Sequence, residues 1–395
     1  AARGVYVPVN PRLSDREVEQ LVTTVAPAAI VAGRDDDARV ASLRLPDLAD
    51  AATDDGDVAL VQTTSGTTGQ PRPVPLRHST VLTLLDGVVG TVAGGRRDTT
   101  DRPPMPNLIP VSLSLWAGIY NVCFAFRVGA PVVLMERFDP RELARLVRRF
   151  EIRSVVLPPA AMAMCCDDDE VTSLEPLRYV RSITAPLSPF LVRRFHDKFG
   201  VAVLNCYGQT ELGGEVVGWS AADWREFGAT KLGAVGRPHA GVEVRVDESG
   251  ELWVRTPESG GSGVDLGERV DAEGWIRTGD CGRVDDDGFV WIEGRVSDMV
   301  NRGGLKVFPA EVEEVLRGAA GVEDVAVVGV ADERLGEVPV AFVVGRFDAV
   351  ELEAHARTHL APYKVPVRFE AVAVLPRNEI GKVLTRELTG RATQG

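Results

Sequence analysis

The stretch Thr63-Thr64-Ser65-Gly66-Thr67-Thr68-Gly69-Gln70-Pro71-Arg72 is the most informative part of the chain. It follows the apolar run 58–61, which predicts a buried strand. Glycines and hydroxyl side chains in one short turn allow backbone N–H groups and hydroxyls to converge on an anion, and Arg72 adds a positive charge. No Gly-Lys-Ser/Thr sequence closes the turn, so it is not a Walker loop. We interpret the stretch as a phosphate-binding loop, with a flexible linker rich in Ser, Thr and Gly as the alternative.

The composition is that of a folded protein with room for two or three domains: 395 residues, 45% hydrophobic and 26% charged. A formal net charge of −13 argues against nucleic acid or an anionic membrane as partner, because either would need a basic face. Five cysteines show no zinc-binding spacing, which favours a reduced, cytoplasmic protein. No apolar run reaches transmembrane length and the first residues do not resemble a signal peptide, so we expect no membrane partner.

Helices and short apolar strands alternate over the first two thirds of the chain. A helix is predicted over 188–200, where Ser-Pro begins it and Gly ends it. The runs 154–157 and 201–204 predict buried strands on either side of that helix. This alternation predicts a layered α/β fold with largely parallel sheets. From about Gly241 the pattern changes to short alternating strands such as 251–255, separated by Gly and Asp turns.

A second, smaller unit is expected from residue 296 to the end of the chain. A helix over 309–316 buries apolar residues at helical spacing, and strands follow around 325–330 and 338–344. A further helix near 349–360 completes an α+β module of viable domain size. The acidic runs of the chain, such as Asp285-Asp286-Asp287, are interpreted as solvated loops.

Four further motifs follow the phosphate loop in a fixed order. Residues 205–211 read NCYGQTE directly after a strand, and 275–280 read WIRTGD. Residues 294–300 read GRVSDMV and lead to Gly303-Gly304, and 376–382 read PRNEIGK. Each motif alone is weak, but five in this order resemble the adenylate-forming superfamily of acyl-CoA synthetases, aryl-CoA ligases, luciferases and peptide-synthetase adenylation domains. The resemblance covers nearly the whole chain.

The resemblance implies an enzyme that joins a carboxylic acid to the α-phosphate of ATP, releases pyrophosphate and then passes the acyl group to a thiol. It implies an AMP-binding large domain over 1–295, built of layered α/β subdomains and a β-rich subdomain. A mobile C-terminal lid domain over 296–395 would turn on a hinge at Ser297, where relatives usually carry Asp or Lys. The implied cofactors are ATP or AMP, Mg²⁺, and coenzyme A or the phosphopantetheine of a carrier protein.

The resemblance also assigns the site residues. The loop from Thr63 to Gly69, with Arg72, would hold the β- and γ-phosphates. Lys382 would bridge the substrate carboxylate and the ribose 5′ oxygen, and Glu211 would bind Mg²⁺, which prefers oxygen ligands. The other implied positions are Thr210 at the α-phosphate, Arg295 on the nucleotide, Tyr207 against adenine, Gly208 and Gln209 beside it, Asp280 on the ribose hydroxyls, and Gly303 and Gly304 at a thiol tunnel.

Each assignment has a structural alternative. Tyr207 could pack in the core at a strand end, Asp280 could simply form a turn, and Lys382 could be an ordinary solvated lysine. For the acid, the resemblance places the substrate among Trp116, Gly118, Tyr120, Asn121, Thr184, Ala185, Pro186 and Gly208. Residues 183–188, ITAPLS, are similar to the segment of acyl- and aryl-CoA synthetases, which favours an aryl or short-to-medium acyl acid. Tyr120 and Asn121 could instead have packing roles.

Three departures from the family pattern affect the interpretation. Arg72-Pro73 stands where Lys-Gly is usual, and Pro73 removes a backbone donor. No histidine occurs in 108–118, where relatives often have Pro-x-x-His. In relatives that histidine lines the acyl pocket and the thiol tunnel, so its absence leaves the class of acid and the transfer to the thiol open. The first subdomain usual in relatives does not precede the chain, and we expect a truncation, a missing segment or an unusually short member.

Three functions therefore stay open. The first is a ligase that makes an acyl-CoA from a small carboxylic acid. The second is an adenylating enzyme that loads an acyl carrier protein or serves another nucleophile such as nitrite or an amine. The third is a degenerate, non-catalytic nucleotide-binding member. Arg302 and Lys306 are the only local hints of a basic patch for CoA phosphates. We expect a monomer or a homodimer.

Overall fold

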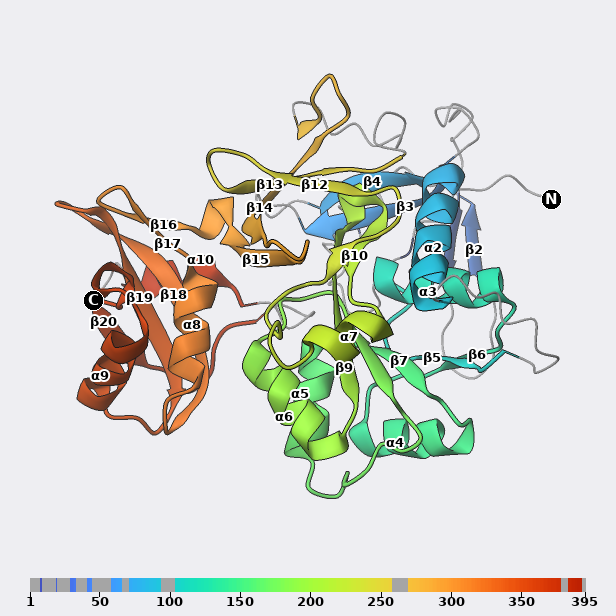
Figure 1. Ribbon diagram of the computed structural model, residues 1–395, viewed down its shortest axis with the longest axis horizontal. Helices are drawn as coiled ribbons and strands as arrows, with labels where there is room; N and C mark the ends of the chain where they lie inside the picture. Colours follow the sequence, from blue (N-terminus) through green and yellow to red (C-terminus); the bar gives the residue numbers. More distant parts are fainter. Residues whose placement is uncertain are drawn as a thin grey trace.

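The computed structural model shows a mixed α/β protein with a large N-terminal part and a smaller C-terminal part, drawn in orange and red (Figure 1). It describes residues 58–65, 71–93, 104–257, 269–377 and 383–392, and in addition 8, 19, 29–32 and 41–44. The predicted fold class is confirmed. None of the helices in these ranges is long and apolar enough to cross a bilayer.

The predicted strand at 58–61 is confirmed and is longer than the apolar run. Strand β3, Val58–Ser65, pairs with β4, Pro71–Arg77, in an antiparallel hairpin, with Ser65 opposite Pro71. The predicted phosphate-binding turn Gly66–Gln70 joins these two strands and lies outside the described residues. Helix α2, His78–Ala93, follows, and a separate pair of short antiparallel strands precedes the hairpin: β1, Ala29–Ala32, and β2, Ala41–Arg44.

A five-stranded sheet in the order β11-β10-β9-β8-β7 forms the centre of the large part. Its first three strands in the chain are parallel, as predicted: β7, Ser154–Leu157, β8, Tyr179–Ser182, and β9, Ala202–Gln209. Two antiparallel strands extend it beyond β9: β10, Gly214–Gly218, and β11, Arg237–Pro238. The carboxyl end of β9 therefore opens at the point where strand direction changes, a common location for ligands in α/β sheets.

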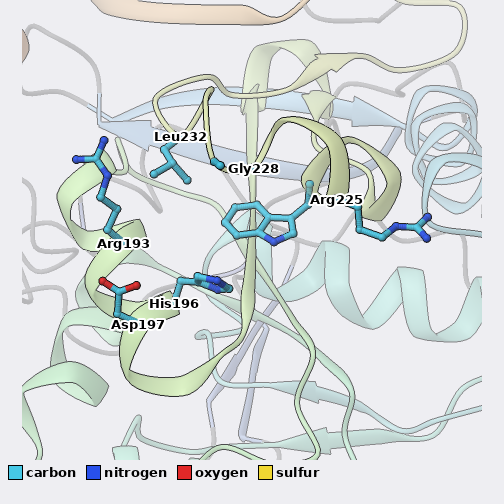
Figure 2. A pocket seen from close by; sticks show the side chains of 8 residues that line it. Arg193, His196, Asp197, Arg225, Gly228 and Leu232 are labelled. Carbon is cyan, nitrogen blue, oxygen red and sulfur yellow. The ribbon is translucent and has the colours of Figure 1, made fainter.

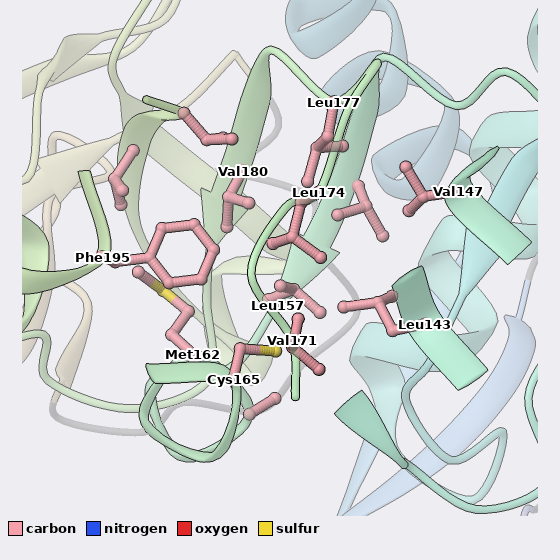
Figure 3. Packing of buried hydrophobic residues seen from close by; sticks show 14 of the residues in the cluster. Leu143, Val147, Leu157, Met162, Cys165, Val171, Leu174, Leu177, Val180 and Phe195 are labelled. Carbon is pink, nitrogen blue, oxygen red and sulfur yellow. The ribbon is translucent and has the colours of Figure 1, made fainter. Parts of the chain in front are cut away.

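Helices cover this sheet and bury its largest apolar cluster, which Figure 3 shows around Phe195, Met162 and Leu157. The predicted helix over 188–200 is confirmed as α6, Pro189–Phe199, with Ser188 accepting from Phe190 N and Gly200 in the left-handed conformation at its end. The remaining elements of this region are α3, Trp116–Val128, α4, Pro140–Arg149, α5, Pro159–Asp167, α7, Ala221–Phe227, the 3₁₀ turn η1, Thr210–Leu212, and the parallel pair β5, Asn107–Ile109, and β6, Val132–Leu134.

A four-stranded antiparallel sheet follows, as the alternating pattern after Gly241 predicts. Its strands are β12, Glu243–Val246, β13, Glu251–Arg255, β14, Ile276–Val284, and β15, Val290–Arg295. The interpretation of 285–287 as a solvated loop is wrong for Asp285, whose side chain is only 15% exposed. Its carboxylate accepts from Phe289 N at 2.9 Å, from the indole of Trp291 at 2.9 Å and from Lys231 at 2.7 Å, so it closes the β14–β15 turn.

The C-terminal part contains the helices and strands predicted for it, around a sheet of its own. Strand β15 ends at Arg295 and the new sheet begins at Val300; where the two domains part remains a prediction. The elements are η3, Val296–Asp298, β16, Val300–Arg302, β17, Leu305–Val307, α8, Pro309–Arg317, β18, Val322–Asp332, β19, Gly336–Gly345, α9, Ala349–His359, η4, Pro362–Lys364, β20, Arg368–Ala371, and α10, Thr385–Ala392.

Among the residues that the structure describes, two hydrogen bonds join the C-terminal part to the large part. Glu314 on α8 accepts a hydrogen bond from Phe190 N at 3.1 Å, at the first turn of α6. A carboxylate there also meets the positive end of the helix dipole. Lys306 at β17 donates to the carbonyl oxygen of Ser249 in the turn between β12 and β13.

Candidate active site

Four of the predicted nucleotide-site residues form one network of hydrogen bonds and an ion pair around Asp280. This carboxylate is buried and accepts from the hydroxyl of Tyr207 at 2.7 Å and from the amide of Gln209 at 2.7 Å. The guanidinium of Arg295 lies 3.0 Å from its other oxygen, because Arg295 stands directly opposite Asp280 in the β14–β15 pairing. The structure thus brings together residues from β9, β14 and β15 that are up to 88 positions apart in the sequence (295 − 207).

The network keeps Tyr207 neutral and in place. Burial and the neighbouring Asp280 charge raise the pKa of Tyr207 well above its usual range, so its hydroxyl remains a donor. Gln209 bridges the ring hydroxyl and the carbonyl oxygen of Thr278 at 3.1 and 2.9 Å. The position of Tyr207 against adenine remains a prediction, and its hydrogen bond to Asp280 is sufficient to orient the ring.

The part of β14 that presents Asp280 is held by a buried carboxylate that sequence reasoning missed. Glu251 on β13 accepts from Gly279 N at 3.0 Å and pairs with Arg277 at 2.7 Å. Gly279 has φ +75°, a conformation that favours glycine. Thr278 adds a hydroxyl that accepts from Asp280 N at 3.1 Å. The Thr-Gly-Asp motif therefore forms an irregular segment within β14, where the pairing with β13 shifts register, and it points a carboxylate toward the end of β9.

The turn after β9 carries the predicted Thr210 and Glu211. Glu211 lies 3.6 Å from the guanidinium of Arg269, which also contacts the Gln209 side chain at 3.3 Å. Arg269 was missed at the sequence level, because nothing in its local pattern distinguishes it from other surface arginines. In the described part of the chain, no three His, Cys, Asp or Glu side chains gather as a metal site. A single carboxylate still suits Mg²⁺, which commonly takes one or two protein carboxylates together with substrate phosphates.

Glycines allow neighbouring backbone and side-chain atoms to come close at this turn. A Cβ on Gly208 would lie 2.0 Å from the carbonyl oxygen of Gly214, so no other residue fits there without a backbone shift. Gly213 has φ +84° and a Cβ there would lie 2.7 Å from the Thr80 side chain on α2. Trp116 donates its indole N–H to the Gly213 carbonyl oxygen at 3.2 Å, so α3 is fastened to the same turn.

The predicted acid-binding residues come from α3 and from the segment after β8. Trp116 and Tyr120 are buried and contact edge to face, with ring centroids 5.5 Å apart. Asn121 donates to the carbonyl oxygen of Ala117 at 2.8 Å, one turn earlier in the same helix. Gly118 allows close approach, since a Cβ there would lie 2.2 Å from Ser112 O. These contacts agree with the packing alternative for Asn121; substrate contact for all four stays a prediction.

The segment after β8 carries a strained backbone. Thr184 has φ +76°, a left-handed conformation that costs a non-glycine residue about 1–3 kcal/mol. Thr184, Ala185 and Pro186 are exposed, between the buried Ser182 and the start of α6. Strain of this kind is concentrated at functional sites, which agrees with the predicted role of this segment.

A buried charged cluster lies beside these residues and was missed entirely. Arg181 on β8 donates to the Glu215 carboxylate on β10, and His239, just after β11, lies 2.8 Å from the same oxygen. The side chains of Arg181 and Glu215 are each 10% exposed and that of His239 is 4% exposed. Burial alone would raise the pKa of Glu215, but the Arg181 charge and the His239 hydrogen bond hold it below its usual value. A Cβ on Gly218 would lie 2.5 Å from that Glu215 oxygen, so glycine provides the space.

The predicted thiol-tunnel glycines form the tip of the β16–β17 hairpin. Gly303 and Gly304 have φ +60° and +88°, as a two-residue turn requires. Arg302 does not extend as a free phosphate-binding group, because its guanidinium donates to the carbonyl oxygens of Tyr363 and Val365 at 2.8 and 3.2 Å. That hint of a CoA patch is therefore not supported. The predicted hinge Ser297 lies in η3 and its hydroxyl contacts Asp298 at 2.9 Å.

Several predicted site residues cannot be placed. Lys382 and the turn from Gly66 to Gly69 lie outside the described residues, as do the side chains of Thr63, Thr64, Ser65 and Arg72. Their roles remain predictions.

A separate pocket of about 390 Å³ lies between α6 and the turn after α7 (Figure 2). Arg193, His196 and Asp197 line one side, and Arg225, Gly228 and Leu232 lie across from them, with Trp224 and Ala229 completing the wall. None of these residues belongs to the predicted site. Its lining is mostly exposed, and it has no buried polar group aimed into it.

Comparison with known proteins gives concordant results. A model of AMP-binding enzymes matches residues 1–261, and a model of the C-terminal domain of AMP-binding enzymes matches residues 311–382. The chain is 35% identical over 349 residues to a 3-[(3aS,4S,7aS)-7a-methyl-1,5-dioxo-octahydro-1H-inden-4-yl]propanoyl:CoA ligase of Mycobacterium tuberculosis, covering 86% of this chain and 67% of the relative. It is 33% identical over 354 residues to a fatty acid–[acyl-carrier-protein] ligase of Streptomyces coeruleorubidus, covering 83% and 66%.

A solved structure of o-succinylbenzoate CoA synthetase from Bacillus subtilis, in complex with its acyl-adenylate intermediate, superposes with a TM-score of 0.73 at 27% identity, covering 84% of this chain and 69% of that one. The same enzyme with ATP and magnesium gives 0.72 at 27% identity, covering 84% and 70%. The chain spans about two thirds of the length of these relatives.

Proposed function

The chain belongs to the family of AMP-binding enzymes, and we propose that it is an AMP-forming acid–thiol ligase. The reaction has two halves. A carboxylic acid attacks the α-phosphate of ATP to give an acyl-adenylate and pyrophosphate, and a thiol, most simply that of coenzyme A, then takes the acyl group and releases AMP.

The observation that carries this proposal is the Asp280 network. Tyr207 and Gln209 donate to one oxygen of a buried carboxylate at the end of β9, and the Arg295 guanidinium forms an ion pair with the other oxygen. A carboxylate offers about four lone-pair directions, so roughly two remain for ribose hydroxyls. This arrangement suits a nucleoside held by its sugar and base, because it combines a carboxylate fixed on β14, a neutral aromatic ring and an exposed arginine.

The first half-reaction requires positive charge and donors at the transferring phosphoryl group, because two anions must meet. We propose that the turn between β3 and β4 binds the β- and γ-phosphates and that Thr210 binds the α-phosphate. Lys382, carried by the C-terminal part, would hold the substrate carboxylate and the ribose 5′ oxygen while charge moves between them. Removing one such contact typically costs about 10²–10³ in rate.

Glu211 is the residue we propose for Mg²⁺, together with phosphate oxygens of ATP. Bound there, the cation would neutralise charge on the triphosphate. Arg269, 3.6 Å from Glu211, holds the carboxylate toward the nucleotide network.

For the acceptor, coenzyme A is our first proposal, with relatives named as CoA ligases in support. A carrier-protein phosphopantetheine is the second candidate, because one relative is named as a ligase for an acyl carrier protein and Arg302 is already engaged by backbone carbonyls. A cytoplasmic setting is also proposed, since all five cysteines are free.

Exchange of labelled pyrophosphate into ATP, driven by a panel of carboxylic acids, tests the first half-reaction. Thioester formation with CoA and with a phosphopantetheinylated carrier protein then separates the two acceptors. We expect exchange only when a suitable acid is present, and thioester only with CoA. Thioester on the carrier protein alone would support the second candidate.

A further inference from the structure

Arg269 lies between the two carboxylates that are proposed to bind Mg²⁺ and the ribose. One of its guanidinium nitrogens, Nη1, is 3.6 Å from Glu211. Another, Nη2, donates to the side-chain oxygen of Gln209 at 3.3 Å. The side-chain nitrogen of Gln209 donates in turn to Asp280 at 2.7 Å. A single arginine thus connects Glu211 with Asp280 through one amide.

The Arg269 guanidinium is held in place by the backbone of the strand that carries Asp280. Its Nε and Nη2 atoms both donate to the carbonyl oxygen of Arg277, at 3.1 and 2.9 Å. That carbonyl belongs to β14, three residues before Asp280. A bridge between Val270 and Ile276 holds the adjoining backbone beside the same strand. Because the guanidinium is planar and is held at two nitrogens, the direction of the third nitrogen, Nη1, is fixed as well.

The amide of Gln209 has two possible orientations, and Arg269 and Asp280 favour the same one from opposite ends. The amide nitrogen is within hydrogen-bond distance of Asp280, of the Tyr207 hydroxyl at 3.1 Å and of the Thr278 carbonyl oxygen at 2.9 Å. In the reversed orientation, the amide oxygen would face the Asp280 carboxylate and the nitrogen would face the guanidinium, so like groups would oppose each other at both ends. The positive charge of Arg269 also polarises the amide, which strengthens its donation to Asp280.

Glu211 and Gln209 share the charge of this one guanidinium. The Glu211 contact of 3.6 Å is longer than a hydrogen bond and Arg269 is 38% exposed, so the ion pair is weak. When Glu211 binds a divalent cation, its negative charge is taken up and the guanidinium acts on Gln209 alone. The hydrogen bond from Gln209 to Asp280 then becomes stronger. Because such coupling is reciprocal, a ribose bound at Asp280 also favours the cation at Glu211.

We propose that Arg269 is a positioning residue that couples the carboxylate for Mg²⁺, Glu211, to the carboxylate for the ribose, Asp280. It acts through the amide of Gln209. As a result, the site discriminates more strongly for the ribose hydroxyls when Mg²⁺ is bound than when it is not. This role rests on the proposed function, because it concerns how the nucleotide site holds ATP together with Mg²⁺.

Calorimetric titration with three nucleotides tests this role. The dissociation constants of ATP, 2′-deoxy-ATP and 3′-deoxy-ATP are measured without any carboxylic acid, once with Mg²⁺ and once with EDTA. The proteins are the wild type, Arg269→Met and Arg269→Gln, which remove the charge in two ways, and Arg255→Met as a control. Arg255 is also 38% exposed and pairs with Glu243, outside the nucleotide network. Circular dichroism checks that each variant is folded.

In the wild type with Mg²⁺, at least one deoxynucleotide should bind about tenfold more weakly than ATP, and with EDTA that ratio should fall to about threefold. Both Arg269 variants should show the smaller ratio in either condition, and Arg255→Met should behave as the wild type. A merely structural effect of the substitutions would instead weaken all three nucleotides alike. That result, a wild-type ratio that is the same with Mg²⁺ and with EDTA, or a Mg²⁺-dependent ratio that survives in a folded Arg269 variant would each overturn the proposal.

Exchange of pyrophosphate into ATP, measured in parallel with the panel of acids, separates this role from the proposed function. Acid-dependent exchange without the Mg²⁺-dependent ratio would sustain the function and overturn the role of Arg269. An Arg269-dependent ratio without exchange for any acid would sustain the role in nucleotide binding and overturn the function. Failure of ATP to bind would overturn both.

Discussion

Replacing Asp280 by asparagine perturbs the nucleotide network with little change in shape. Asparagine keeps one acceptor oxygen but turns the other into an amide donor. In the native protein, Tyr207 and Gln209 donate to one carboxylate oxygen, and the Arg295 guanidinium forms an ion pair with the other. The single remaining oxygen of the variant can face either the Tyr207 and Gln209 donors or the Arg295 guanidinium, but not both. If the new amide group faces Arg295, two donors oppose each other. Because Arg295 is 49% exposed, water screens that loss to within about 1 kcal/mol of stability.

The larger effect should be on ATP. A hydrogen bond to a charged group is worth about 1.5–3 kcal/mol, against about 0.5–1.5 kcal/mol for a neutral one. Replacing the carboxylate that holds a ribose hydroxyl should therefore cost about 1–2 kcal/mol, a rise in Kd of about tenfold to thirtyfold. Isothermal titration calorimetry measures the Kd for ATP in the variant and in the wild type, and circular dichroism checks that the variant is folded. A folded Asp280→Asn protein that binds ATP as tightly as the wild type would refute the role of Asp280.

Three further predictions concern stability and the contact between the two parts. Glu314→Ala removes one of the two acceptors of Phe190 N, the one supplied by the C-terminal part, and leaves Ser188. It should raise the rate of proteolytic cleavage in the linker before Val300 about fivefold, corresponding to about 1 kcal/mol. Glu311→Ala, a carboxylate paired within the small part, is the control and should not change that rate. Asp285→Asn should lower the urea midpoint at pH 7. The pKa of Asp285 in the folded protein is about 2, below its unfolded value. Its ionised carboxylate therefore contributes about 2 kcal/mol to the free energy of unfolding above pH 4, and this contribution is lost as the pH falls toward 2. The urea midpoints of variant and wild type should converge there. A difference in urea midpoint that persists at pH 2 would contradict this role of the Asp285 charge. Gly304→Ala places a side chain at φ +88° and should lower stability by about 1–2 kcal/mol; an unchanged melting temperature would argue against the turn geometry.

The sequence predicted most of the framework because its signals are local. The strand at 58–61, the helix capped by Ser188 and ended by Gly200, and the parallel strands around it follow from neighbouring residues. The motif order also pointed to Tyr207 and Asp280 as members of one site, and the structure brings them into contact. What each of them binds remains a prediction.

Features that depend on pairing between strands far apart in the sequence could not be predicted from local patterns. Arg181 and Glu215 are polar residues in otherwise ordinary strands, and nothing local shows that β8 and β10 place them together. Their burial also requires Gly218, whose role is visible only in three dimensions. The structural role of Asp285 could have been predicted, because this Asp is followed by Gly three residues later and by Trp six residues later, as also at 247–253.

The most direct test of the whole account is acid-dependent exchange of pyrophosphate into ATP, compared between the wild type and Lys382→Ala. We predict exchange in the wild type with at least one carboxylic acid, and loss of about 10²–10³ in rate in the variant, with ATP binding retained. A wild type that binds ATP but exchanges nothing with any acid, or a variant that exchanges at the wild-type rate, would contradict it.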